Sequence, residues 1–85
     1  MLDLVIRAIT EPRRREILRL IQDGELPSGQ IASRFEATRP AISQHLKVLA
    51  EAGLVTARRE GTFILYKTRP EGLAELREYL GGFLE

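Results

Sequence analysis

Side chains that could recognise base pairs recur along residues 39–52. At 100° per residue this segment forms a helix with one apolar face, made by Ile42, Leu46, Leu49 and Ala50. The opposite face carries small, neutral and basic polar groups. An α-helix fits the major groove of B-DNA, where glutamine pairs with adenine and serine contacts donors or acceptors. The pattern predicts a DNA-binding set composed of Thr38, Arg39, Ser43, Gln44 and Lys47.

The same residues would also suit the solvated face of an ordinary amphipathic helix, and residues 39–52 alone leave both interpretations open. Two observations outside the helix favour binding. Residues 27–69 carry seven basic and three acidic side chains, whereas the whole chain has a net charge of only +1. Two β-rich runs, 54–59 and 62–68, follow the helix directly and predict a hairpin.

Arg58 and Arg59 lie at the end of the first β-rich run, next to the predicted Glu60–Gly61 turn. From a protruding hairpin they could reach a DNA phosphate or an adjacent minor groove. Charges at a hairpin edge also protect against strand-to-strand aggregation, and that alternative stays open.

His45 is the single histidine, and it falls at the boundary between the two faces of the helix. It could donate to a phosphate or pack its ring against the edge of the core, and we include it among the DNA-binding candidates. The chain has no cysteine and no second histidine, so we expect no metal site, no cofactor and no catalytic activity. For the basic run of residues 13–15 we favour structural ion pairs over DNA contact.

The elements that must position these side chains can be placed by periodicity and capping. We expect helices at about 2–10, 12–23, 28–35 and 39–52, a hairpin at 54–68 and a helix at 70–80 that breaks near Gly81 and Gly82. Glu11 before Pro12 and Thr38 before Arg39 are helix N-terminal signals, and Gly53 is a C-cap closed by Leu54. The result is a single domain, 1–85, mainly α with a β-hairpin wing. The order ααααββα is that of a winged helix-turn-helix.

Eighty-five residues form only a small core, and without cysteines a second copy is the expected source of further buried surface. We expect a homodimer held by apolar residues of the first and last helices: Leu2, Val5, Ile6, Leu73, Leu76 and Leu80. No apolar run is long enough for a membrane span and no secretory signal is apparent, which predicts a cytoplasmic protein.

Three stretches, Ile9–Leu18, Arg39–Leu49 and Ala52–Val55, together resemble the ArsR-type winged helix-turn-helix transcriptional regulators. The resemblance covers nearly the whole chain. It implies a bacterial or archaeal homodimeric repressor whose first and last helices form the dimer interface and whose helix 39–52 enters the major groove. Metal sensors of that family carry two cysteines at the start of the third helix, where this chain has Pro27 and Gly29.

The predicted function is therefore sequence-specific binding of double-stranded DNA at an inverted-repeat operator, without metal sensing. The alternative is a winged-helix module that binds another protein and does not recognise DNA sequence.

Overall fold

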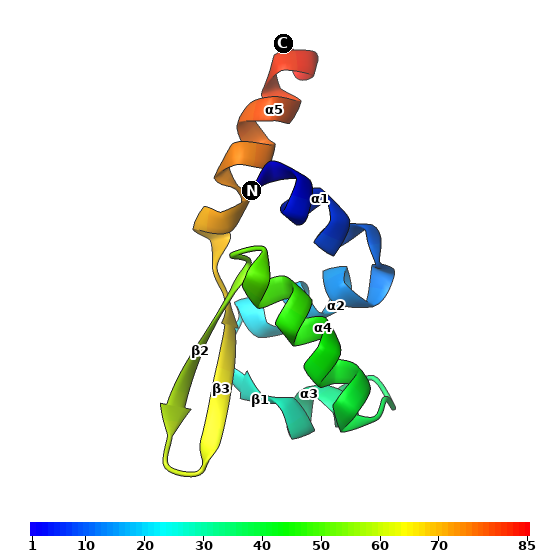
Figure 1. Ribbon diagram of the computed structural model, residues 1–85, viewed down its shortest axis with the longest axis vertical. Coiled ribbons are helices and arrows are strands. Elements are labelled where there is room, and N and C mark those ends of the chain that lie inside the picture. The colour runs from blue at the N-terminus through cyan, green and yellow to red at the C-terminus, as the bar shows by residue number, and fades with distance from the viewer.

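The computed structural model describes all 85 residues as five α-helices, one 3-10 turn and a three-stranded antiparallel sheet (Figure 1). The elements are α1 (Leu2–Thr10), α2 (Pro12–Gln22), β1 (Leu26–Pro27), α3 (Ser28–Arg34), α4 (Arg39–Glu51), β2 (Val55–Glu60), β3 (Phe63–Thr68), the 3-10 turn (Pro70–Leu73) and α5 (Ala74–Leu84). This is a winged helix-turn-helix, in which α3 and α4 form the helix pair and the hairpin β2–β3 forms the wing.

The apolar core lies between α1, α2, α3, α4 and the base of the wing. Its buried members are Val5, Ala8, Ile17, Leu18, Ile21, Ile31, Ala32, Ile42, Leu46, Leu49, Ala52, Leu54 and Val55. Ala50 was expected on the inner face of α4 but is exposed. The buried stripe is centred on Ile42, Leu46 and Leu49, and Ala50 lies at its edge.

Local capping explains where α2 and α4 begin and where α4 ends. The Glu11 side chain accepts a hydrogen bond from the Arg13 amide at 3.3 Å, and the Thr38 hydroxyl accepts one from the Ala41 amide at 3.3 Å. At the far end of α4, Gly53 has a φ of +76°. Its amide donates to the Ala50 carbonyl at 3.0 Å and the Leu54 amide to the Leu49 carbonyl at 2.9 Å. These two bonds are the expected Schellman motif.

The wing sheet has one strand more than the sequence analysis predicted. The strand order is β1-β3-β2, with Leu26 opposite Tyr66 and Pro27 opposite Leu65. Strand β1 is only two residues long and contains a proline, so it has no alternating pattern from which it could be recognised. It becomes a strand because β3 lies beside it.

The last helix also differs from its prediction, because α5 continues through Gly81 and Gly82 to Leu84. A glycine in a helix costs about 1 kcal/mol relative to alanine, which weakens a helix without necessarily ending it. Tyr79 and Phe83, one turn apart, pack edge to face across this stretch with ring centroids 5.2 Å apart.

The molecule is elongated, 45 Å along its longest axis, and its two ends differ. Helix α5 extends from one end, beside the start of α1 (Figure 1). The tip of the wing, α3 and the N-terminal end of α4 lie at the other end. The tip of the wing and the N-terminal end of α4 are therefore well separated from α5 (Figure 1).

Candidate nucleic-acid interface

Helix α4 presents a polar, solvent-exposed face opposite its buried stripe. Ser43, Gln44 and Lys47 are all exposed on it. Arg39, also exposed, extends toward the start of α3 and approaches the Ser28 hydroxyl at 3.5 Å. Thr38 uses its hydroxyl to cap α4, which fixes the direction in which this helix leaves the preceding loop.

His45 faces α2 and is only partly exposed. Its Nδ1 atom lies 3.4 Å from Nη1 of Arg14. A guanidinium can only donate, so Nδ1 accepts and the ring proton belongs on Nε2. Burial lowers the pKa of His45 below its ordinary value, and the neighbouring Arg14 charge lowers it further. The ring borders a groove of about 400 Å³ that is lined by Glu11, Pro12, Arg13, Glu16, Ala37, Ala41 and His45.

This lowered pKa predicts a pH dependence of stability. The unfolded chain binds a proton at His45 more readily than the folded chain does. The contribution of neutral His45 to the free energy of unfolding is therefore complete above the ordinary pKa of 6.5. It is lost as the pH falls through the lower pKa of the folded protein. We expect the unfolding free energy of the wild type to decrease below about pH 6.5, and His45→Gln to lack this component. Urea denaturation between pH 5.5 and 7.5 measures both, and parallel pH profiles would contradict the assignment.

The three arginines of residues 13–15 bind carbonyl groups at helix ends. Arg14 Nε donates to the Ala8 carbonyl at 2.6 Å, and Arg15 Nη1 donates to the Ile9 carbonyl at 2.6 Å, both at the end of α1. Arg13 Nη1 donates to the Phe35 carbonyl at 3.1 Å after α3. The role of these three arginines is therefore structural, as expected. They act mainly by donating hydrogen bonds to carbonyl groups, and the one ion pair among them joins Arg13 to Glu16.

The two arginines of the wing have different surroundings. Arg58 forms ion pairs with Glu25, from the loop before β1, and with Glu60. Arg59 is exposed and forms no ion pair. The sequence analysis predicts that both are available for DNA. Within this structure Arg58 is already neutralised by carboxylates, because the fold brings Glu25 beside it.

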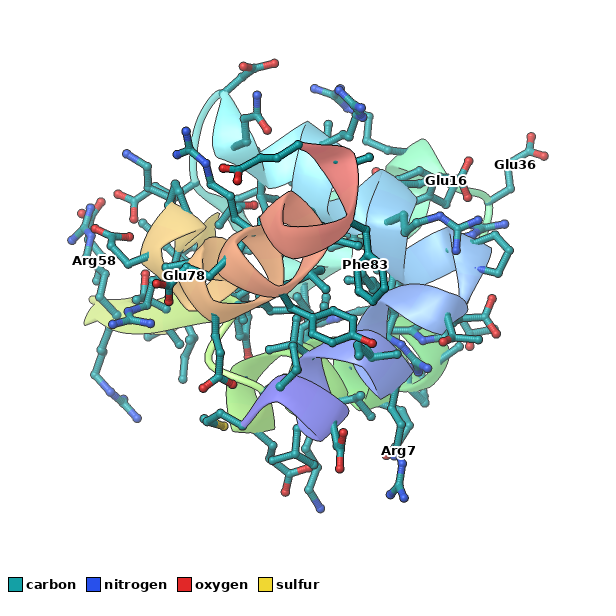
Figure 2. All side chains as sticks on the ribbon, turned by 90° about the horizontal axis from the view of Figure 1, so that it is seen from above. Arg7, Glu16, Glu36, Arg58, Glu78 and Phe83 are labelled. Atoms are coloured by element: carbon teal, nitrogen blue, oxygen red, sulfur yellow. The ribbon has the colours of Figure 1, made fainter.

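An apolar surface covers parts of α1 and α5 that the chain itself leaves open. Ile6 is 39% exposed, Leu80 46% and Phe83 72%. Leu2, Leu73 and Leu76 are half-buried. Val5, predicted to belong to the interface, is instead 2% exposed and lies in the core, because α1 buries that side against α2 and α4. Leu4, Tyr79 and Leu84, which were not predicted, extend the exposed surface. Phe83 and the acidic Glu78 leave α5 on opposite sides (Figure 2).

No group of histidine, aspartate and glutamate side chains is arranged to hold a metal ion. No helix is both long and apolar enough to cross a membrane.

Residues 11–57 match the bacterial arsR family of regulatory proteins. The chain belongs to this family. It is 35% identical over 80 residues to the transcriptional repressor SdpR of Bacillus subtilis. The matched region covers 94% of this chain and 89% of SdpR. Members of the ArsR family are transcriptional regulators, not enzymes, and their DNA-binding domains are winged helix-turn-helix domains.

Solved structures of similar proteins have the same fold. Reduced HlyU from Vibrio cholerae superimposes with a TM-score of 0.74, at 35% identity over 87% of this chain and 79% of that protein. A homodimeric winged helix-turn-helix DNA-binding domain from Mycobacterium bovis superimposes with a TM-score of 0.77, at 34% identity. That match covers 98% of this chain and 80% of the other.

Proposed function

We propose that this ArsR-family chain is a homodimeric repressor that binds a specific double-stranded DNA sequence through α4. The observation that carries the proposal is the exposed polar face of α4, with Ser43, Gln44 and Lys47, at the same end of the molecule as the wing. The opposite face of the same helix is buried, so the core holds α4 in place and leaves its polar side open for a major groove.

The residues divide by chemistry into those that contact bases and those that contact phosphates. Ser43 and Gln44 are neutral and suit base edges. Arg39, Lys47 and Arg59 are exposed cations and suit phosphates. The Nε2–H of His45 is a further donor for the DNA backbone. Thr38 contributes to DNA binding indirectly, because it caps α4 and so helps to position this helix.

The apolar surface of α1 and α5 is proposed as the dimer interface. Support comes from its exposed residues Ile6, Leu80 and Phe83 and from the homodimeric Mycobacterium bovis structure. A two-fold dimer presents two α4 helices, so its operator is an inverted repeat with half-sites about one helical turn, roughly 34 Å, apart.

Salt-dependent DNA binding tests this function against the alternative of a protein-interaction module. Three phosphate-facing cations in each protomer, Arg39, Lys47 and Arg59, correspond to six contacts in a dimer. The logarithm of the association constant should then fall with the logarithm of salt concentration with a slope of about −5. Fluorescence anisotropy with random duplex DNA measures this slope. Affinity that is absent, or independent of salt between 50 and 300 mM, would favour the protein-interaction module.

A further inference from the structure

A polar contact joins the wing to the loop between α2 and β1. Arg58 in β2 donates from Nε to both carboxylate oxygens of Glu25, at 3.0 Å each, and its Nη2 also contacts Glu25. The same Nη2 lies 2.8 Å from a carboxylate oxygen of Glu60. Glu25 and Arg58 are 33 residues apart in the sequence, and Arg58 lies at the periphery of the molecule (Figure 2).

The outer part of the wing makes few other contacts with the rest of the protein. In β2 only Val55 is buried, and Thr56–Glu60 are exposed. A two-stranded hairpin is only marginally stable by itself, and the third strand, β1, contributes just two residues. Arg58 is opposite Leu65 in β3, and Leu65 is opposite Pro27 in β1. The Glu25–Arg58 pair therefore spans all three strands at the point where the apolar packing ends.

We propose that Glu25 is a positioning residue that sets the direction of the wing relative to α3 and α4 by holding Arg58. The phosphate contact of the wing is then made by Arg59, which forms no ion pair. The first part concerns the free protein, and the second rests on the proposed DNA-binding function. The Arg58 guanidinium also holds the pKa of Glu25 below its ordinary value, with a smaller effect from Lys67. An exposed ion pair adds little to global stability, so its loss should change the wing and leave the fold intact.

Hydrogen exchange of the free protein tests the positioning. Glu25→Gln removes the negative charge with little change in shape, and Arg58→Gln removes the positive charge and shortens the side chain. Both should speed amide exchange at residues 58–65, and the double variant should be no faster than either single variant. Arg59→Gln is the matched control and should leave exchange unchanged. Exchange that is as slow in both variants as in the wild type would overturn the positioning role.

Salt-dependent binding to DNA tests the division between the two arginines. Arg59→Gln should reduce the magnitude of the dimer's salt slope by about two units, one for each protomer. Arg58→Gln should leave the slope unchanged while weakening binding to the preferred operator about three- to tenfold, and Glu25→Gln should weaken it similarly, as expected for coupled neighbours. A slope reduced equally by Arg58→Gln and Arg59→Gln would show that Arg58 leaves Glu25 for a phosphate and would overturn the assignment.

The exchange measurement and the DNA-binding measurement test the positioning role and the proposed function separately. A wild-type protein that binds no DNA would contradict the proposed function and the phosphate assignment of Arg59. The exchange measurement would still decide whether Glu25 positions the wing.

Discussion

Leu80→Asp is expected to convert the proposed homodimer into folded monomers. Leu80 is 46% exposed and lies on the apolar side of α5 with Phe83, outside the core of its own chain. Because the proposed interface is two-fold, one substitution in each protomer places two carboxylates in it. Burying an unpaired carboxylate costs several kcal/mol, which corresponds to a dissociation constant about a thousandfold higher. Sedimentation velocity at micromolar concentration measures the change, and circular dichroism verifies the fold.

Ala74→Asp is the matched control, because it adds the same carboxylate to an exposed position on the polar side of α5, in its first turn. This variant should remain dimeric. Leu76→Asp should give monomer or unfolded chain, since Leu76 also packs against the core. A wild type that sediments as a monomer, or a Leu80→Asp variant that stays dimeric, would refute the interface.

Gln44→Ala is expected to lower affinity for the preferred operator while leaving affinity for random DNA nearly unchanged. Gln44 is exposed on α4, and its amide can form two hydrogen bonds with adenine. Losing a base contact of this kind costs about 1 to 3 kcal/mol, or roughly 5- to 150-fold in affinity. Selection from a random DNA pool, followed by titration of the recovered sites, measures both the affinity and the sequence preference.

Gln22→Ala provides the control, since Gln22 is an exposed glutamine at the end of α2. Its recovered sites should match those of the wild type, whereas Gln44→Ala should relax the preference at one position in each half-site. The assignment of α4 fails if the wild-type sites lack dyad symmetry, or if Gln44→Ala and Gln22→Ala yield the same consensus.

Local sequence signals were sufficient to predict the helices, the wing and the polar face of α4. Apolar residues with a helical repeat identify the buried stripe of α4, and the caps at Thr38 and Gly53 limit its length. These features depend on residues only a few positions apart. The exposed side of a helix follows once its buried side is known, so Ser43, Gln44 and Lys47 could be named from the sequence.

Only the tertiary structure decided which of the candidate side chains are free. Glu25 reaches Arg58 across 33 residues and Arg14 reaches His45 across 31, and in each case no local pattern records that the two meet. Strand β1 depends in the same way on β3. Val5 and Ile6 are adjacent apolar residues of α1, yet one is in the core and the other is on the surface. The side of α1 that is buried is set by the packing of α2 and α4, which sequence periodicity in α1 alone cannot determine, because a helix that is apolar on two sides has no unique inner face.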